Sequence, residues 1–174
     1  MLHLYLFRHA KSSWDSAGND DFDRPLNARG RAAAPAMAGH MAASGITPEI
    51  ILCSAAQRAR ETLGLAIPAF DHDCVIRIER SLYLADAATL LERVKSLPAD
   101  ARQCMLIGHN PGFEHLAQLL AGNGTADEMR SLRAKFPTAA VAEITFAQPR
   151  WDDIAPGTGH LQRFVIPRAL PAEI

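Results

Sequence analysis

Short apolar runs recur along the chain, and most of them stop abruptly at polar residues. A run of this kind is typical of a strand that is buried in a parallel sheet. The runs predict strands at residues 1–7, 50–53, 75–78, 103–107, 141–146 and 160–166. The stretches between them predict helices at residues 28–43, 55–66, 87–97 and 113–121. Because strands alternate with helices, we expect an α/β fold with a mostly parallel sheet and helices on both of its faces.

Capping and helix-breaking residues refine the helix boundaries. Asn27 precedes the first predicted helix and Asp86 precedes the third, and both are residue types that accept hydrogen bonds at helix N-termini. Pro35 interrupts the first helix, so it either kinks that helix or marks a start later than the cap suggests. The Gly-Asn-Gly segment at residues 122–124 ends the fourth helix.

Length and charge limit the classes of protein to which the chain can belong. With 174 residues, of which 48% are hydrophobic, residues 1–174 are expected to form a single domain with a substantial core. The formal net charge of −1 argues against nucleic-acid binding through a charged face. No apolar run reaches membrane-spanning length, and the first residues lack the basic segment of a signal peptide, so we expect neither a membrane protein nor a secreted one.

The cysteines indicate the redox setting. There are three of them, an odd number, and Cys53 and Cys104 lie inside apolar runs. Both are therefore expected to be buried free thiols and not a disulfide. This pattern is typical of a reducing, cytoplasmic compartment.

Polar side chains follow three of the predicted strands at the point where each strand ends. In open α/β sheets, ligands bind just beyond the carboxyl ends of the strands. If the strands are parallel neighbours, their polar ends should therefore meet in one pocket. The side chains concerned are Arg8, His9, Ser54, Arg58, His109 and Asn110. A structural interpretation of the first pair is that Arg8 ends the strand and His9 lies in a surface turn.

Two guanidinium groups and two imidazoles in one pocket suit phosphoryl transfer. Arg8 and Arg58 could each direct two donors at the phosphoryl oxygens, and His109 could add another hydrogen bond. His9 could attack phosphorus through a neutral ring nitrogen, and neighbouring cations should lower its pKa and keep it neutral. The arginines would supply the charge that a metal supplies elsewhere, so we expect neither a metal nor a cofactor.

Four motifs, in order and at compatible spacing, resemble the histidine phosphatase superfamily, also called phosphoglycerate-mutase-like. The motifs are Leu6-Phe7-Arg8-His9-Ala10-Lys11-Ser12, Arg24-Pro25-Leu26 with Gly30, residues 54–62, and Gly108-His109-Asn110-Pro111-Gly112. The Arg-His-Ala-Lys-Ser form and the short chain are similar to the small SixA-type phosphohistidine phosphatases. The resemblance implies a three-layer α/β/α sandwich.

The resemblance also implies roles for individual residues. His9 becomes the phosphorylated nucleophile, and Arg8, Arg58 and His109 become the phosphate pocket. Three further side chains lie close enough in the motifs to assist in substrate binding: Asn110, Lys11 and Ser12.

A proton donor for the leaving group is harder to find. Larger members of the family carry a separate carboxylic acid, and here the corresponding region offers Glu79 and Asp86. Simpler interpretations are that Asp86 is a helix N-cap and Glu79 a surface residue. A phosphohistidine needs such an acid less than an alkyl ester does, because imidazole leaves more easily than an alkoxide. The predicted substrate is therefore a phosphohistidine in a phosphorylated protein, such as a phosphotransfer or signalling protein.

Other interpretations remain open. The chain could be a mutase or a broad phosphatase of small phosphoesters, both of which require a proton donor. It could also be a phosphate-binding module without catalysis, although binding alone does not need a nucleophile between two arginines. Trp14 and Trp151 lie in predicted loops. Either could line the rim of the pocket, but packing over the edge of the sheet is the simpler expectation.

Overall fold

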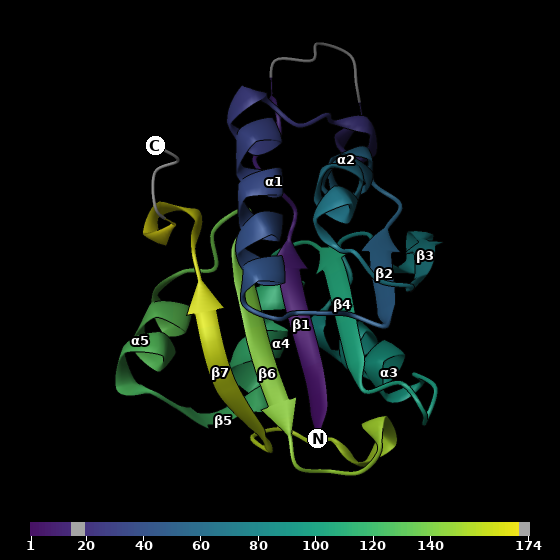
Figure 1. Cartoon of the computed structure of the whole chain (residues 1–174), viewed down its shortest axis with the longest axis vertical. Coiled ribbons are helices and arrows are strands. Elements are labelled where there is room, and N and C mark those ends of the chain that lie inside the picture. The colour runs from purple at the N-terminus through teal and green to yellow at the C-terminus, as the bar shows by residue number, and fades with distance from the viewer. Residues whose placement is uncertain (15–19, 171–174) are drawn as a thin grey trace.

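A computed structural model of the chain describes residues 1–14 and 20–170 and arranges them around one central sheet (Figure 1). Residues 15–19, part of a polar segment that follows the first predicted strand, lie outside the described residues. Within the described part, the sheet has seven strands in the order β3-β2-β4-β1-β6-β7-β5. The strands are β1 (Leu2–Arg8), β2 (Ile50–Ser54), β3 (Val75–Glu79), β4 (Gln103–Gly108), β5 (Ala121–Gly124), β6 (Val141–Phe146) and β7 (Gly159–Val165).

The sheet is mostly parallel, as predicted. Strands β3, β2, β4 and β1 pair in parallel, and so do β5 and β7. Only β6, among the strands of the described residues, runs against its neighbours, because it pairs antiparallel with both β1 and β7. The carboxyl ends of β1, β2 and β4 therefore meet at one edge, the upper edge in Figure 1.

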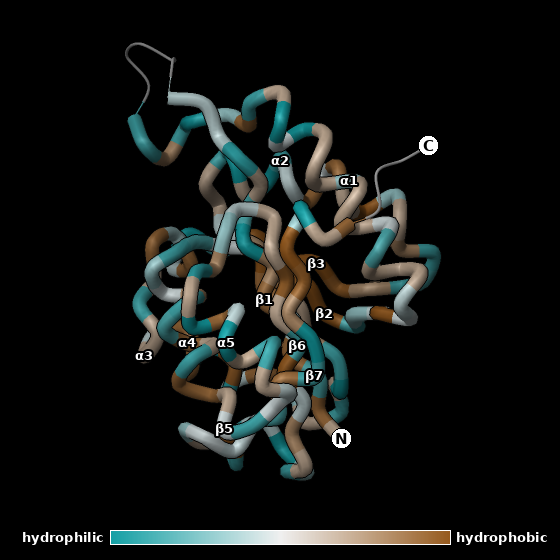
Figure 2. Tube along the Cα trace, turned by 90° about the vertical axis from the view of Figure 1, so that its left-hand side faces the viewer, coloured by the Kyte–Doolittle hydropathy of each residue, from teal (hydrophilic) through white to brown (hydrophobic). Residues whose placement is uncertain are grey.

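Helices cover both faces and complete the predicted three-layer α/β/α sandwich. One apolar cluster joins the sheet to α1 and α2, and the other joins its opposite face to α3, α4 and α5. Figure 2 shows the hydrophobic residues concentrated along the strands between the two helical layers. The helices are α1 (Ala28–Ala43), α2 (Gln57–Ala66), α3 (Ala87–Lys95), α4 (Gly112–Leu120) and α5 (Ala126–Ala134).

Both predicted N-caps are present. The side chain of Asn27 accepts a hydrogen bond from the backbone of Gly30, and that of Asp86 accepts one from Thr89. Helix α1 begins directly after Asn27 and continues through Pro35, so a later start at the proline is wrong. The cap satisfies backbone donors that would otherwise have no partner in the first turn of the helix.

Two elements were not predicted, β5 and α5. Strand β5 has the sequence Ala-Gly-Asn-Gly, which carries little side-chain pattern. Its Gly122 lies so close to Gly157 that an added Cβ would come within 1.9 Å of the Gly157 carbonyl oxygen. Helix α5 buries only Leu132, so its apolar periodicity is weak. The sequence does contain a pattern typical of a helix start here, because Thr125 caps the helix and Glu128 follows three residues later.

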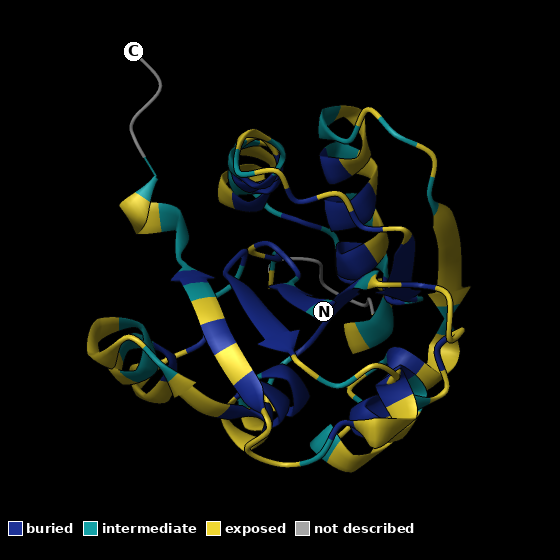
Figure 3. Ribbon diagram, turned by 60° about the horizontal axis from the view of Figure 1, so that its bottom comes forward, coloured by how far each residue is buried: buried dark blue, intermediate teal, exposed yellow. Residues whose placement is uncertain are grey.

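The two ends of the strand order differ in exposure, as Figure 3 shows. Strand β7, which lies between β6 and the edge strand β5, alternates between buried and exposed residues. Strand β3, the edge strand at the other end, is exposed along most of its length. The side chains of Val75 and Ile78 on β3 are 53% and 54% exposed. No helix in the described ranges combines the length and the apolar character needed to cross a membrane.

Two smaller predictions concern buried side chains. Cys53 and Cys104 are buried free thiols, as expected. Trp151 is also buried, and its indole nitrogen donates to the carbonyl oxygen of Ala101 at 2.7 Å. Packing is therefore confirmed for Trp151, whereas Trp14, described below, lies elsewhere.

Candidate active site

A cavity of about 240 Å³ lies at the edge of the sheet where β1, β2 and β4 end. The four residues expected to carry the reaction line it: Arg8, His9, Arg58 and His109. The three residues expected to assist line it as well: Lys11, Ser12 and Asn110. The fold thus brings together in one cavity all seven residues that the motifs single out for the reaction and for substrate binding.

His9 lies directly beyond β1 and is almost fully buried. Its Nδ1 lies 2.7 Å from the carbonyl oxygen of Ala10, and its Nε2 lies 3.3 Å from Nε of Arg58. A carbonyl can only accept, and the Arg58 nitrogen can only donate. Both contacts therefore place the ring proton on Nδ1, which leaves Nε2 with its lone pair.

Hydrogen bonds fix the backbone around His9 and join it to neighbouring elements. The amide of His9 donates to the carbonyl of Gly108 at 3.0 Å, which joins the loop to the end of β4. The amide of Ala10 donates to Oγ1 of Thr62 at 3.0 Å, and the same hydroxyl donates to the carbonyl of Arg58 at 2.7 Å. The buried Thr62 thereby connects the loop of His9 with the helix that carries Arg58.

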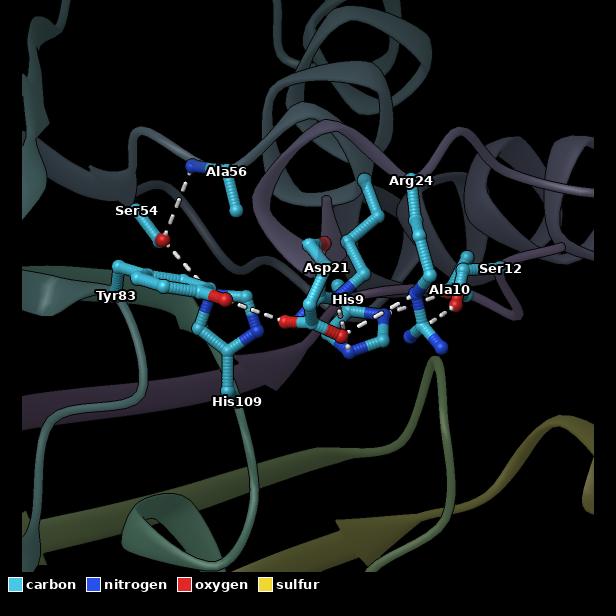
Figure 4. Close-up of polar contacts among 10 residues, drawn as sticks. His9, Ala10, Ser12, Asp21, Arg24, Ser54, Ala56, Tyr83 and His109 are labelled. Carbon is cyan, nitrogen blue, oxygen red and sulfur yellow. Dashed lines mark hydrogen bonds and ion pairs between the residues drawn. The ribbon is translucent and has the colours of Figure 1, made fainter. Parts of the chain in front are cut away.

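His109 faces His9, with the two ring centroids 5.1 Å apart. Its Nε2 lies 2.7 Å from Oγ of Ser54, which also accepts from the amide of Ala56 (Figure 4). With that amide already directed at the oxygen, the serine is free to donate its own hydrogen to Nε2. Nδ1 of His109 then carries the ring proton and can donate to a ligand.

Four buried nitrogens around the cavity have no hydrogen-bond partner among the described residues: Arg8 Nε, Arg24 Nε, Arg24 Nη1 and His109 Nδ1. Of these, Arg24 Nε has only its ion-pair contact with Asp21 at 3.4 Å. A buried donor without a partner is costly, by about 1–3 kcal/mol, and more when it is charged. Unsatisfied donors from three separate elements around one cavity are typical of a site that binds an oxyanion. Arg24 belongs to a quoted motif, but its place in the pocket was not predicted.

Asp21 brings a carboxylate into the same cavity, and this was not predicted. One of its oxygens lies 3.0 Å from Nη2 of Arg58 and 2.5 Å from the hydroxyl of Tyr83, and the other lies 3.4 Å from Nε of Arg24. Burial alone would raise the pKa of Asp21, but the Tyr83 hydroxyl and Arg58 outweigh burial and lower it. Asp21 lies in the short 3-10 helix Asp21–Asp23, and Tyr83, which contacts Asp21 without lining the cavity, directly follows another. No periodic pattern in the sequence indicates either position.

The two carboxylates that were considered as proton donors lie elsewhere. Neither Glu79 nor Asp86 lines the cavity. Glu79 is held by Arg93 through both of its oxygens, with the shortest contact at 2.7 Å. Asp86 caps α3, as its simpler interpretation proposed. The geometry therefore gives neither residue access to a leaving group.

Burial and the arginines keep both imidazoles neutral. Burial, reinforced by His109 and Arg58, lowers the pKa of His9 well below its ordinary value, although the bond to Ala10 acts in the opposite direction. Burial and then Arg58 lower the pKa of His109 to about 3. The sequence predicted the direction for His9 from its neighbouring cations, and the structure adds burial as the larger cause.

The assisting residues differ in what they contact. Oγ of Ser12 accepts from Nη2 of Arg24 at 2.9 Å, so Ser12 holds an arginine in place. The side-chain nitrogen Nδ2 of Asn110 donates to the carbonyl oxygen of Phe136 at 3.0 Å, and Nη1 of Arg8 donates to that same oxygen at 2.7 Å. The side chain of Lys11 is exposed at the rim.

Trp14 also lies at the mouth of the cavity and is 75% exposed. The guanidinium carbon of Arg24 lies 3.5 Å from the centre of its ring. The expectation that Trp14 packs over the sheet edge is therefore wrong.

The described residues contain no candidate metal site. Among residues 1–14 and 20–170, no group of three or more His, Cys, Asp or Glu side chains is placed so that it could hold a metal ion.

Comparison with known proteins gives consistent matches. Residues 4–83 match the family description "Histidine phosphatase superfamily (branch 1)". An uncharacterized protein of Mycobacterium leprae is 33% identical over 168 residues, which cover 92% of this chain and 99% of that protein.

Two solved structures align over nearly the whole chain. A protein from Agrobacterium tumefaciens, assigned as the phosphohistidine phosphatase SixA, is 30% identical with a TM-score of 0.80, covering 95% of this chain and 97% of that one. A protein from Nakamurella multipartitia with the same assignment is 28% identical with a TM-score of 0.81, covering 97% of each chain.

Proposed function

Because this chain belongs to the histidine phosphatase superfamily, in its SixA-type branch, we propose that it removes the phosphoryl group from phosphohistidine in a phosphorylated protein, through a covalent intermediate on His9. Membership of the family makes the chain a phosphatase. The observation that carries the finer proposal is the lone pair on Nε2 of His9, which is held beside Arg58 and faces His109.

In the first step, the hydrogen bond from Arg58 Nε to Nε2 of His9 opens, and the lone pair of Nε2 attacks phosphorus. A bond forms between Nε2 and phosphorus, and the bond from phosphorus to the leaving nitrogen breaks. The leaving imidazole keeps that electron pair and takes up a proton from solvent. His9 is suited to this step because its Nδ1 proton is already directed at the carbonyl of Ala10, which fixes the tautomer.

In the second step, water attacks the phosphorus of phospho-His9. The bond from Nε2 to phosphorus breaks, orthophosphate is released, and the proton of the attacking water passes to solvent or to the departing phosphate. His9 is returned neutral, which its lowered pKa favours. The same nitrogen then serves the next turnover.

Arginine and imidazole donors supply the charge stabilisation in both steps. The free Nε of Arg8, Nη1 of Arg24 and Nδ1 of His109 can each donate to an equatorial phosphoryl oxygen. Arg58 adds a further cation directly beside the attacking nitrogen. These donors provide the positive charge that the transferring group requires, and on this ground we propose that the reaction needs no metal ion.

The state of Asp21 favours phosphohistidine over alkyl phosphates. Asp21 is the only carboxylate that lines the cavity within residues 1–14 and 20–170, and its contacts with Tyr83 and Arg58 hold it ionised because they lower its pKa. An ionised carboxylate cannot protonate an alkoxide leaving group. An imidazole leaving group needs that proton less, so a phosphohistidine is the substrate that suits a cavity whose described lining holds no protonated carboxylic acid.

The test measures orthophosphate release from a histidine-phosphorylated protein and from an alkyl phosphate, with EDTA present in both assays. We expect turnover of the phosphohistidine in EDTA, faster than that of the ester, and no turnover by His9→Ala. The matched control is His115→Ala, because His115 is an exposed histidine of α4 that does not line the cavity. A chain quenched during turnover should carry acid-labile phosphate that His9→Ala lacks.

Other results would support the other functions. Faster turnover of alkyl phosphates would favour a broad monoester phosphatase or a mutase. Binding of phosphate without turnover of any phosphoryl donor would favour a binding module. Loss of turnover in EDTA would overturn metal independence.

The buried free thiols Cys53 and Cys104 support a further proposal, that the protein works in a reducing, cytoplasmic compartment.

A further inference from the structure

The mouth of the cavity carries two exposed apolar side chains, Trp14 and Leu84. Their exposed fractions are 75% and 50%, whereas His9, which also lines the cavity, is only 5% exposed. Among the described residues, the cavity therefore has a buried polar floor, and its rim carries these two apolar side chains together with the exposed Lys11. An in-line attack by His9 sends the leaving group to the side of phosphorus opposite Nε2, which is toward this rim.

The side chain of Trp14 is held in position by its contact with Arg24. The guanidinium of Arg24 lies 3.5 Å from the centre of the indole ring, within the range of a cation–π contact. Arg24 is itself fixed by Ser12 at 2.9 Å and by Asp21 at 3.4 Å. These contacts connect the indole of Trp14, through Arg24, with the anion site. They therefore fix the position of the indole relative to a bound phosphoryl group.

Leu84 is held in an unusual backbone conformation. Its φ angle is +50°, in the left-handed region that a leucine seldom occupies. The neighbouring Ala85 approaches Gly112 so closely that an added Cβ would come within 2.0 Å of the Ala85 carbonyl oxygen. The loop is thus packed tightly against the start of α4, and this packing presents the Leu84 side chain at the rim. Strained residues of this kind cluster at ligand sites.

We propose that Trp14 and Leu84 form a clamp for the leaving group, which selects phosphoryl groups attached to a flat aromatic ring. This inference rests on the proposed function and narrows it, since the imidazole of a phosphohistidine is such a ring. The indole stacks on the ring of the leaving group, and Leu84 covers it with an apolar contact. Because both side chains are exposed, they can contact a ring that is presented on the surface of another protein.

The binding test uses two phosphonates that cannot be hydrolysed, phenylphosphonate and methylphosphonate, measured by calorimetry on the full chain. We expect the phenyl compound to bind about threefold to tenfold more tightly, as one aromatic stacking contact provides. Trp14→Ala should abolish this preference, Trp14→Phe should retain part of it, and the affinity for methylphosphonate should stay within about twofold of the wild-type value.

Two further variants complete the binding test. Leu84→Asn removes the apolar side chain and keeps a residue that tolerates a positive φ, so it should reduce the preference without disturbing the loop. Ile78→Ala is the matched control, because Ile78 is an equally exposed apolar residue on β3, outside the cavity. It should leave both affinities unchanged.

Turnover separates this inference from the proposed function. With p-nitrophenyl phosphate and ethyl phosphate as substrates, Trp14→Ala should lower kcat/KM several-fold for the aromatic ester alone. If the wild-type chain binds phenylphosphonate preferentially but hydrolyses nothing, the proposed function fails and the clamp stands. Three results would overturn the clamp. The wild-type chain could bind the two phosphonates with equal affinity, it could bind neither, or Trp14→Ala could lose affinity for both to the same extent.

Discussion

Nε of Arg58 lies 3.3 Å from Nε2 of His9, so the guanidinium donates to the nitrogen that is proposed to attack phosphorus. The other two nitrogens of Arg58 donate to Asp21, one to its backbone carbonyl and one to its carboxylate. A single buried cation thus contacts both the nucleophile and the carboxylate of the pocket. Its planar, forked geometry is what permits both contacts.

Replacing Arg58 with lysine should therefore lower kcat/KM about 100-fold, because a lysine keeps the charge but cannot reproduce the fork. The matched control is Arg60→Lys. Arg60 lies on the same helix, but it is exposed and donates to the carbonyl of Ala55 outside the cavity. Steady-state kinetics on both variants checks the prediction. A drop of similar size in Arg60→Lys would contradict it.

The acid limb of the pH–rate profile should lie below the pH at which an ordinary histidine titrates. Burial lowers the pKa of His9, as do His109 and Arg58, so the nucleophile stays neutral in mildly acidic solution. We expect kcat/KM to show no enzyme ionisation near 6.5, the ordinary value for histidine. The measurement uses two substrates whose phosphates have different pKa values. A limb near 6.5 that stays in place for both substrates would rule out a neutral, buried His9.

Stability should fall in acid because of the same histidines. Burial and then Arg58 lower the pKa of His109 to about 3, while an unfolded histidine titrates near 6.5. Between these values the unfolded state binds more protons, so the free energy of unfolding falls as the pH drops from about 6.5 toward 3. Urea unfolding of His109→Asn between pH 7 and pH 4 should show a shallower slope, by up to about 1.4 kcal/mol per pH unit. Equal slopes for the variant and the wild-type chain would refute this.

Gly30 and Gly39 of helix α1 provide a matched pair for stability. A Cβ added at Gly30 would lie 2.1 Å from the carbonyl oxygen of Lys11, in the loop that follows His9, whereas a Cβ at Gly39 meets nothing within 4 Å. Gly30→Ala should destabilise the protein by roughly 2 kcal/mol or more and lower activity, because the loop must move. Gly39→Ala should stabilise it by up to about 1 kcal/mol through helix propensity. Thermal unfolding and phosphatase assays on both variants check the prediction. Equal stability and activity of the two variants would contradict it.

Asp21 should compete with bound anions for Arg58. Its carboxylate lies 3.0 Å from the Arg58 guanidinium and 3.4 Å from that of Arg24, both of which line the cavity. We expect Asp21→Asn to bind tungstate or orthophosphate several-fold more tightly, because the competing charge is gone. Asp23→Asn, a change of the same kind in the same short 3-10 helix, serves as the control and should have no such effect. Weaker anion binding in Asp21→Asn would show instead that the carboxylate mainly positions Arg58.

The sequence predicted the part of the site that lies on regular elements. Arg8 is the last residue of β1 and His9 follows it, His109 follows β4, and Arg58 lies in the first turn of α2. Each position was therefore determined by a periodic pattern together with the rule that parallel strands end at one edge. The same patterns predicted the layers of the fold and both N-caps.

The residues that were missed reach the pocket from irregular segments. Asp21 lies in a short 3-10 helix, and Tyr83 follows another. Their placement depends on tertiary contacts, such as the edge-to-face packing of Tyr83 on His109 at 5.5 Å, which no local pattern encodes. Trp14 was placed wrongly because exposure is unusual for so large an apolar side chain. Helix α5 was missed because only Leu132 of its residues is buried.

The central position of β1 has a consequence for how the site is assembled. His3 of β1 pairs with Gln103 on one side and with Thr145 on the other, so the first strand of the chain is enclosed by strands that are synthesised much later. Such distant contacts slow folding, because a long loop must close before they form. His9 acquires its surroundings only after β4 and β6 have joined β1. We therefore expect catalytic activity to appear late during refolding, and a ribosome-bound chain that ends before β6 to lack it.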